Sequence, residues 1–504
     1  MSDNKRIAKN TIMLYFRMIL NLIVSIYTGR VVLQVLGVDD FGIYNIVGGV
    51  VVLFSFINNF LNTACQRFIS VSIVESSKSE PVKVFHTALF LHFIIAVLFV
   101  LAAETLGLWF VSNKLVLPDN RLSAAIWLYH ICVLNTCLTI LRVPYNAAII
   151  AEEKMDFYAY TSIGETLLRL LIVYCLSIIA YDKLLVYGLL QLLILIIMLV
   201  WYIIYAKRRF SYCSFSMRYD IHYLKQMLSF SGWNLFGSLA DIAYKQGSNI
   251  ILNIFYGVGL NAAMGLATTV RSTIFNFVSN FQVASNPQII KQYSSASYVS
   301  YCELVYRVSK FSYILMLFIA LPAFLNMNFI LSVWLDTVPP YTALFVQFGL
   351  LYCLIDCLHG PLWTTMISTG RIRNYQVFTS VLLFLNLPLS YVALSFGYSP
   401  ISILVIQIFI SLVTLLIRIA FSSKYAQLNC IDYINKVLLP IICLTVFAVP
   451  FPFYISSFYE DSFYKLVFSG LLSVSCVFFA TYFVALSSEE RKLVNQFLKS
   501  KFSR

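Results

Sequence analysis

Residues 10–36, NTIMLYFRMILNLIVSIYTGRVVLQVL, decide the fold class of this 504-residue chain. About 20 apolar residues in a helix cross the hydrocarbon core of a bilayer, and this stretch is longer. It is also longer than the core of a signal peptide, and no small-residue cleavage site follows it. We therefore expect a transmembrane helix that the mature protein retains.

The rest of the chain repeats this character. It is 60% hydrophobic and 11% charged, with a mean hydropathy of +0.83, whereas soluble domains carry about 25% charged residues. We predict an all-α polytopic membrane protein without a separate soluble domain. About 14 segments are long enough to span a bilayer: residues 10–36, 41–74, 84–111, 122–150, 155–180, 184–205, 227–256, 259–290, 311–332, 341–369, 374–397, 400–421, 437–457 and 463–486.

The basic residues predict the orientation of these spans. The chain has 35 Lys and Arg residues. With the N-terminus in the cytoplasm, most of those outside the spans fall on the cytoplasmic side. The outer side receives only Lys114, Arg121, Lys183 and Lys465. This asymmetry satisfies the positive-inside rule with both termini cytoplasmic. The net charge of +13 then indicates loops that face anionic lipid rather than a nucleic-acid partner.

The chain contains an internal repeat with a period of about 220 residues. SFINNF at Ser55–Phe60 corresponds to NFVSNF at Asn276–Phe281, and VVLQ at Val31–Gln34 corresponds to IILN at Ile250–Asn253. Pro144, Lys154 and Tyr158 match Pro361, Arg371 and Tyr375 in the same order. We therefore predict two pseudosymmetric six-helix lobes of equal orientation, residues 1–206 and 227–422. A basic cytoplasmic linker, residues 207–226, joins them, and two extra helices with a cytoplasmic tail follow in residues 423–504.

Such a duplication is typical of alternating-access transporters, whose binding site lies between the lobes near the middle of the membrane. Three stretches also resemble a known family: Thr28–Leu33, Leu36–Tyr44, and Pro144–Ala151 with Lys154-Met155 after it. They are similar to the polysaccharide-transport proteins of the multidrug/oligosaccharidyl-lipid/polysaccharide exporter superfamily, which includes Wzx-type O-antigen flippases.

The resemblance implies a MATE-like fold in the inner membrane. It implies transport of undecaprenyl-diphosphate-linked oligosaccharide, the repeat unit of O-antigen, capsule or exopolysaccharide, from the cytoplasmic to the periplasmic face. Membrane lipids, a coupling H⁺ or Na⁺, and the polysaccharide polymerase machinery are the partners that fit this role.

Eight cations lie inside the predicted spans, where each costs roughly 2.5–3.5 kcal/mol on insertion: Arg17, Arg30, Arg67, Arg142, Arg169, Lys245, Arg271 and Arg418. Arg17, Arg67 and Arg142 fall in the cytoplasmic half of the first lobe, and Arg271 falls at mid-depth in the second. We predict that these four arginines, together with Lys245, bind the diphosphate. The alternative for the inner-half set is snorkelling to the cytoplasmic interface or backbone capping. We expect Arg418 to act as an interfacial anchor.

Asp241 and Lys245 are four residues apart and share one helix face. Either they neutralise each other, or Asp241 binds a coupling H⁺ or Na⁺ and releases Lys245 for the diphosphate. Glu165 and Arg169 repeat this spacing, and here a structural ion pair is the favoured interpretation.

Two further sites are candidates for gating or coupling. Arg30 lies near the outer end of the first span, close to Asp39 and Asp40, which fits either an outer salt bridge or snorkelling. Asp356 and His359, three residues apart, fit either a proton relay or a hydrogen-bonded core histidine.

The sequence contains no nucleophile elbow, P-loop, HEXXH motif or metal-spaced cluster, so we predict neither an enzyme nor a cofactor. The eleven cysteines read as small buried hydrophobes. A polymerase or ligase needs an extramembrane chamber, for which the short loops leave no room. A drug exporter for cationic amphiphiles needs acids, whereas cations dominate here. That exporter and a lipid II flippase remain the alternative functions.

Overall fold

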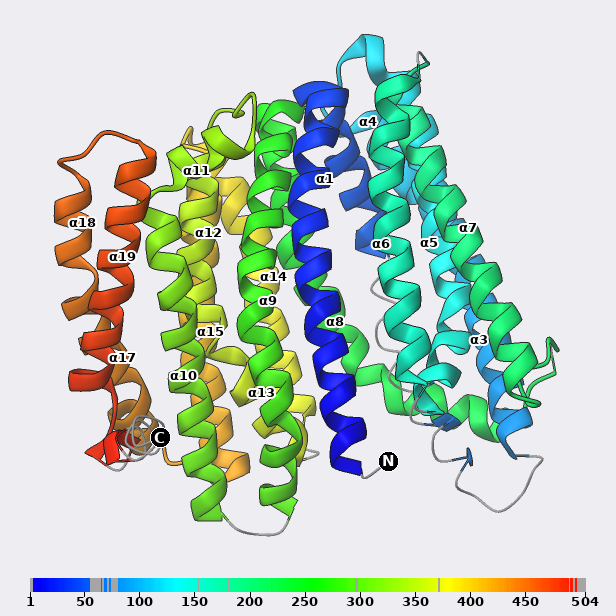
Figure 1. Cartoon of the computed structure of the whole chain (residues 1–504). Coiled ribbons are helices and arrows are strands. Elements are labelled where there is room, and N and C mark those ends of the chain that lie inside the picture. The colour runs from blue at the N-terminus through cyan, green and yellow to red at the C-terminus, as the bar shows by residue number, and fades with distance from the viewer. Residues whose placement is uncertain are drawn as a thin grey trace. The chain divides into compact units, whose positions relative to one another are not determined.

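The computed structural model describes residues 3–54, 65, 68, 69, 72, 73, 80–152, 154–179, 181–216, 218–294, 298–369, 372–488, 490–492 and 495. All regular elements in these ranges are helices (Figure 1). They are α1 (Asp3–Phe54), α3 (Glu80–Ala102), η1 (Ala103–Gly107), α4 (Leu108–Asn113), η2 (Asp119–Arg121), α5 (Leu122–Ala151), α6 (Met155–Ile178), α7 (Lys183–Arg209), α8 (Ile221–Tyr256), α9 (Val258–Ser294), α10 (Tyr298–Leu325), α11 (Met327–Trp334), α12 (Thr342–Asp356), α13 (His359–Thr369), α14 (Arg373–Ser395), α15 (Ser402–Ala426), α16 (Cys430–Tyr433), η3 (Ile434–Leu438), α17 (Leu439–Ala448), α18 (Pro450–Ser456), α19 (Phe463–Ala480) and η4 (Thr481–Ala485).

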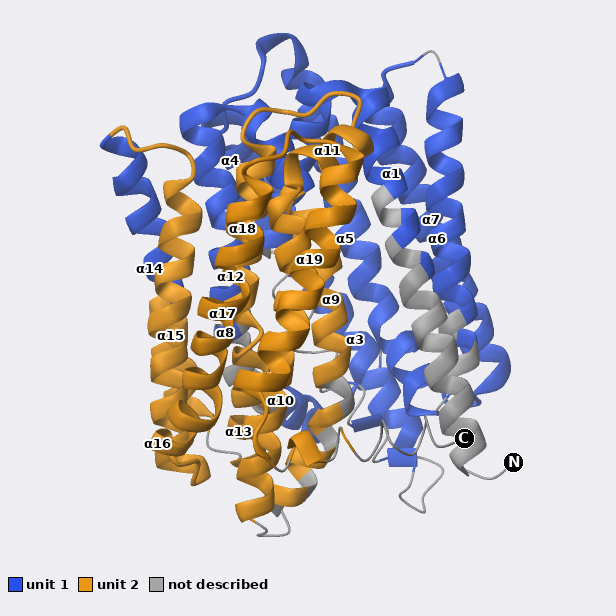
Figure 2. Cartoon of the chain, turned by 60° about the vertical axis from the view of Figure 1, so that its left-hand side comes forward, with its two compact units in different colours: residues 1–266, 383–396 blue, residues 267–382, 397–504 orange. Residues whose placement is uncertain are grey.

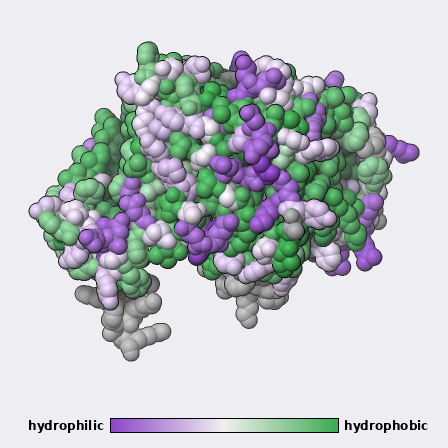
Figure 3. Space-filling model, turned by 90° about the horizontal axis from the view of Figure 1, so that it is seen from above, coloured by the Kyte–Doolittle hydropathy of each residue, from purple (hydrophilic) through white to green (hydrophobic). Residues whose placement is uncertain are grey.

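Within the described ranges, 11 segments are long and apolar enough to cross a membrane. Each overlaps one of the predicted spans, and the three other predictions, 10–36, 227–256 and 259–290, fall in α1, α8 and α9. Many large apolar side chains of the described residues are exposed, as lipid contact requires. In the end-on view of Figure 3, hydrophobic residues lie beside hydrophilic ones. The prediction of an all-α multi-pass membrane protein is confirmed.

The chain forms two compact units (Figure 2). Unit 1 comprises residues 1–266 and 383–396, and unit 2 comprises residues 267–382 and 397–504. Helix α9 therefore leaves unit 1 after Leu266, and the second part of α14 belongs to unit 1. These units are not the same segments as the predicted lobes, whose boundary lies in the 207–226 linker, so the lobe division stays a prediction.

Two glycines make the same turn at equivalent points of the sequence repeat. Gly37 interrupts α1 with φ 79° and ψ 172°, and Gly257 separates α8 from α9 with φ 72° and ψ −168°. Side chains other than glycine rarely adopt this conformation. Each glycine follows shortly after one copy of the matched segment, Val31–Gln34 or Ile250–Asn253. The two turns thus fall at similar points of the predicted repeat, and the predicted break between the first two spans is a single residue with non-helical torsions, Gly37.

Buried amides fix the second of these turns in unit 1. The side-chain amide of Asn253 donates to Oδ1 of Asn261 over 2.8 Å, and Asn261 donates to Oδ1 of Asn249 over 2.7 Å. The backbone N–H of Val116 donates to Oδ1 of Asn253 over 2.9 Å. All three asparagines are buried. A buried polar network with its groups paired favours one arrangement of the helices that it joins.

A proline and a glutamine shape the break between α12 and α13 in unit 2. Pro361 lacks an N–H, so the helix cannot satisfy the carbonyl of Cys357 four residues earlier. Nε2 of Gln282, on α9, donates to that carbonyl over 2.6 Å and to Oγ of Ser312 over 3.0 Å. Three other prolines, Pro144, Pro322 and Pro388, lie inside α5, α10 and α14.

A capping box begins the helical turn after η4. The N–H of Ser487 donates to Oε2 of Glu490 over 2.8 Å, and the N–H of Glu490 donates to Oγ of Ser487 over 3.3 Å. This reciprocal pair satisfies two N–H groups that a helix start leaves free. Nζ of Lys310 donates to the same Oε2 of Glu490 over 2.5 Å. The C-terminal segment is thereby tied to α10 through a buried ion pair.

Candidate functional site

Two arginines share one carboxylate between α5 and α6 in unit 1. Nη2 of Arg169 donates to Oε1 of Glu165 over 2.8 Å, and Nη1 of Arg142 lies 3.4 Å from Oε2. Arg169 and Glu165 are four residues apart on α6, whereas Arg142 reaches Glu165 from α5. We call these three residues the Glu165 cluster. It carries one cation in excess of its carboxylate.

The cluster is partly open. The side chains of Arg142 and Glu165 are 21% and 20% exposed, and that of Arg169 is 50% exposed. Arg142 also lies over the ring of Tyr202 on α7, 5.4 Å from its centroid. The ring fixes the guanidinium and leaves part of its donor edge accessible, which suits an anionic ligand.

The other two members of the predicted inner-half set are not placed. Arg67 and the side chain of Arg17 lie outside the described residues, although the backbone of Arg17 belongs to α1. Of these three arginines, Arg142 is the one whose side chain lies among the described residues. The grouping of Arg17, Arg67 and Arg142 stays a prediction.

Arg271 on α9 has an aromatic partner in unit 2. Its guanidinium lies 5.4 Å from the ring centroid of Tyr352 on α12. Gly349, one turn earlier, leaves room for the arginine, since a Cβ there would lie 3.2 Å from Cδ of Arg271. The hydroxyl of Tyr352 donates to Oδ1 of Asp356 over 3.3 Å. Tyr352 therefore contacts both Arg271, through its ring, and Asp356, through its hydroxyl.

A tyrosine ring lies beneath a third intramembrane arginine as well. Arg418 is 5.5 Å from the ring centroid of Tyr375, in unit 2. A cation over an aromatic face loses less on leaving water than an isolated cation. The sequence contains 33 tyrosines, but the spacing within one helix gives no sign of which ring meets which arginine.

Asp241 and Lys245 on α8 form the ion pair that their spacing predicts. Nζ of Lys245 donates to Oδ2 of Asp241 over 2.9 Å, and both side chains are about half exposed. The structure thus shows Asp241 paired with Lys245. Mutual neutralisation and ion coupling both include this paired state. A coupling role for Asp241 stays a prediction.

Asp40, one of the two carboxylates predicted to lie near Arg30, bonds to Arg121. Arg121, before α5, donates through Nε and Nη2 to Asp40 over 2.7 Å and 2.6 Å. Its Nη1 donates to Asp182 over 2.6 Å. Asp182 also accepts from the N–H groups of Leu184 and Leu185 at the start of α7. A gating role for Arg30 stays a prediction.

These hydrogen bonds affect the acidity of Asp182. The hydrogen bond from Arg121 lowers its pKa, and the helix N–H groups add to this against a smaller effect of burial. Asp182 is therefore ionised at neutral pH. Arg121 joins the kinked region of α1 to the starts of α5 and α7.

Asp356 and His359 belong to two successive helices. Helix α12 ends at Asp356, and α13 begins at His359 after the break at Cys357. Asp356 accepts from Tyr352, whereas Nε2 of His359 pairs with Oγ of Ser411 over 3.0 Å. A two-residue turn, Cys357 and Leu358, therefore separates the two residues. A relay through them stays a prediction.

A histidine and a glutamate form a pair that the sequence analysis did not identify. Nδ1 of His130 on α5 lies 2.9 Å from Oε2 of Glu104. Glu104 belongs to η1, a π-helical turn that changes the direction of its side chain relative to an α-helix. The π-turn leaves no clear sign in the sequence, so the two residues could not be matched beforehand.

Comparisons with known proteins were made on sequence and on structure. No family model matches the chain, and no curated protein sequence matches it. Among solved structures, the lipid II flippase MurJ in an inward closed conformation aligns with a TM-score of 0.67 at 12% identity, covering 94% of this chain and 98% of MurJ. An inward-facing multidrug resistance MATE transporter of the MOP superfamily aligns with a TM-score of 0.64 at 11% identity, covering 82% and 96%.

A third structure is that of a MOP superfamily transporter from Pyrococcus furiosus, described as having a binding pocket of reverse polarity. It aligns with a TM-score of 0.57 at 10% identity, covering 83% of this chain and 96% of its own. These identities establish a shared fold and leave the substrate open. The chain is a multi-pass membrane protein with the fold of MOP superfamily transporters.

Proposed function

We propose that this protein is a flippase of the inner membrane. Its cargo is undecaprenyl-diphosphate-linked oligosaccharide, which it moves from the cytoplasmic to the periplasmic face by ion-coupled alternating access. Both termini lie in the cytoplasm, and the six-helix lobes 1–206 and 227–422 alternate around the cargo. The polymerase machinery that lengthens the glycan is the partner that receives it.

The observation that carries the proposal is the excess cation of the Glu165 cluster. Glu165 neutralises one of the two guanidinium groups, so the other can bind an anion without leaving a buried charge unpaired. A diphosphate offers several oxygens to a planar guanidinium, and such charge-assisted bonds are about twice as strong as neutral ones. Cationic drugs would be repelled by the same cluster.

The second arginine in this proposal is Arg271. Its guanidinium lies over the ring of Tyr352, whose hydroxyl bonds to Asp356, and these contacts hold the guanidinium in place. In the first lobe, Tyr202 holds Arg142 at a similar distance. We propose that both arginines contact the diphosphate at different stages of transport, while Asp241 exchanges the coupling ion next to Lys245.

Deletion of the gene, followed by lipid and surface-glycan analysis, tests the proposal. The expected result is loss of surface polysaccharide with lipid-linked oligosaccharide trapped on the cytoplasmic face. Normal surface glycan together with changed drug sensitivity would contradict it and favour a drug exporter.

Complementation of that deletion tests the site. Arg142→Ala leaves Glu165 paired with Arg169, so the protein should reach the membrane at normal levels. Transport should fall about 10-fold or more, because a hydrogen bond to a charged group contributes roughly 1.5–3 kcal/mol. Lys424→Ala removes an exposed cation at the end of α15 and serves as the control. Full transport by Arg142→Ala would exclude the cluster from cargo binding.

Glu165→Gln separates binding from release. It removes the only carboxylate of the cluster, so the lipid-linked cargo should bind more tightly but leave more slowly. The expected phenotype is cargo that co-purifies with the protein while surface glycan declines. A variant that binds less cargo would show that Glu165 orients the arginines instead of competing for them.

Lipid II is a second candidate cargo, and one observation favours it. The alignment with MurJ covers 94% of this chain, against 82% for the inward-facing MATE transporter. Lipid II shares the polyprenyl diphosphate, so the arginine variants alone cannot distinguish the two. Accumulation of lipid II after depletion, with an intact pool of other lipid-linked oligosaccharide, would favour this alternative.

A further inference from the structure

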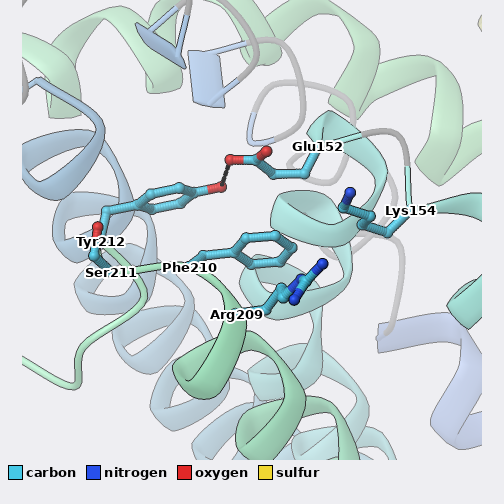
Figure 4. Close-up of a pocket in the computed structure, with 6 residues that line it drawn as sticks. All are labelled: Glu152, Lys154, Arg209, Phe210, Ser211 and Tyr212. Carbon is cyan, nitrogen blue, oxygen red and sulfur yellow. Dashed lines mark hydrogen bonds between the residues drawn. The ribbon is translucent and has the colours of Figure 1, made fainter.

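A small cavity lies where α5 and α7 end in unit 1, apart from the Glu165 cluster. Its volume is about 280 Å³. Glu152 and Lys154 contribute from the segment after α5, and residues 209–212 contribute from the end of α7 (Figure 4). The sequence analysis assigned this end of both helices to the cytoplasmic side.

Backbone hydrogen bonds fix both segments. The N–H of Glu152 donates to the carbonyl of Ala148 over 3.0 Å, and that of Lys154 donates to the carbonyl of Ile149 over 3.0 Å. On the other side, the N–H of Phe210 donates to the carbonyl of Ala206 over 2.9 Å. Each lining segment is therefore a defined helix end.

Aromatic rings support the wall behind the cations. Phe210 is stacked against Tyr212 with ring centroids 5.9 Å apart, and it makes a T-shaped contact with Tyr205 at 6.2 Å. Tyr205 is stacked on Phe157 at 3.7 Å. Phe210 and Tyr212 are both buried. Because these rings are packed together, the cavity is held open by rigid groups.

The cavity separates its opposite charges. The hydroxyl of Tyr212 donates to Oε1 of Glu152 over 3.2 Å, and burial raises the pKa of Tyr212, which keeps this proton. Figure 4 shows the Glu152 carboxylate turned toward Tyr212, while the nitrogen atoms of Lys154 and Arg209 lie on the other side. Within the described residues, neither Lys154 nor Arg209 is paired with a carboxylate.

We propose that this cavity binds a phosphate group through Lys154 and Arg209. A guanidinium and an ammonium on one wall match the oxygens of a phosphate. Lys207 and Arg208 lie in the same helical turn as Arg209 and add to the attraction. Basic pockets at the cytoplasmic ends of membrane helices bind the headgroups of anionic lipids. An anionic phospholipid and free phosphate in solution are the two sources of this group.

Thermal unfolding of the purified full chain in detergent tests the proposal with three probes: short-chain phosphatidic acid, inorganic phosphate, and the matching diacylglycerol without phosphate. Phosphatidic acid should raise the melting temperature in a saturable way, and diacylglycerol should not. Stabilisation by phosphatidic acid alone identifies a lipid site, and stabilisation by inorganic phosphate as well identifies a site open to both sources.

Variants separate this cavity from general surface charge. In Lys154→Gln/Arg209→Gln, the dissociation constant of the phosphate probe should rise about 10-fold or more, since two charge-assisted bonds are lost. Lys183→Gln/Lys225→Gln removes the same charge from exposed sites of unit 1 and should bind as the wild type does. Glu152→Gln should bind more tightly, because the negative charge that repels the phosphate across the cavity is gone.

Two results would overturn the proposal: no stabilisation by either phosphate probe, or equal stabilisation of the wild type and of Lys154→Gln/Arg209→Gln. The melting temperature of this variant without a probe shows whether it is folded. Since Glu152→Gln keeps both cations, its tighter binding provides evidence that a folding defect cannot imitate. The readout is independent of transport, so it also distinguishes this proposal from that of the oligosaccharide cargo.

Discussion

Replacement of Lys310 by methionine should strongly destabilise unit 2. Nζ of Lys310 and Oε2 of Glu490 are 2.5 Å apart, and the two side chains are only 6% and 8% exposed. Without Lys310, the Glu490 carboxylate stays buried with the N–H of Ser487 as a remaining donor. Removing one partner of a buried ion pair costs about 3–5 kcal/mol, because the other charge is left uncompensated.

The double variant Lys310→Met/Glu490→Leu should recover most of this loss. Apolar side chains of similar volume often replace a buried ion pair without a net cost. The loss of the capping box limits the recovery by about 1 kcal/mol. The double variant should therefore lie about 2 kcal/mol or more above Lys310→Met in its free energy of unfolding.

Unfolding in detergent can be followed with a thiol-reactive dye, because the chain has eleven cysteines and several are buried. Lys436→Met is the matched control. Lys436 and Glu303 form an ion pair of 2.6 Å in the same unit, but their side chains are 48% and 40% exposed. An exposed pair contributes about 0–1 kcal/mol. If Lys310→Met were no less stable than Lys436→Met, the reasoning from burial would be refuted.

Three further predictions concern groups described above. Burial raises the pKa of Glu490, but the hydrogen bonds from Lys310 and Ser487 lower it by more, so the pKa lies below its usual value. The ionised carboxylate should contribute its full stabilisation above the unfolded-state pKa of about 4.3. This stabilisation should be lost as the pH falls through the lower pKa of the folded state, and the free energy of unfolding measured against pH will show the loss. Arg121→Gln leaves Asp40 and Asp182 without their shared cation, so the melting temperature should fall. Acidification protonates these carboxylates and should restore part of the loss. Gly360→Ala should destabilise the protein by about 1–3 kcal/mol in the same dye assay, because the new Cβ would lie 2.1 Å from Oε1 of Gln282. An unchanged melting temperature would show that the Gln282 amide can move away freely.

The sequence predicts those features of this protein that depend on short-range periodicity. Long apolar stretches identify the spans, since a bilayer imposes a minimum length. Pairs four residues apart, such as Asp241–Lys245 and Glu165–Arg169, follow from the pitch of one helix. The turn at Gly37 escapes such analysis, because a single residue between two apolar helices leaves no polar loop to mark it.

Contacts between helices were not predictable in the same way. Arg142 meets Glu165 from another helix, and Arg121 meets Asp40 and Asp182 from distant parts of the chain. These partners depend on which helix faces pack together, and apolar helices can pack in many rotations. The sequence identified the charges that are costly in a membrane, but only tertiary structure assigns each charge its partner.

The turns at Gly37 and Gly257 have a mechanical consequence. A connection of one residue has two soft torsions, φ and ψ, and no further length. The helices on either side can change their angle there, but they cannot slide apart along their axes. A shift of one helix along its axis is therefore passed on to the next, while the angle between the two helices stays free to change. Such a one-residue connection occurs at Gly37 and again at Gly257, once in each half of the predicted repeat.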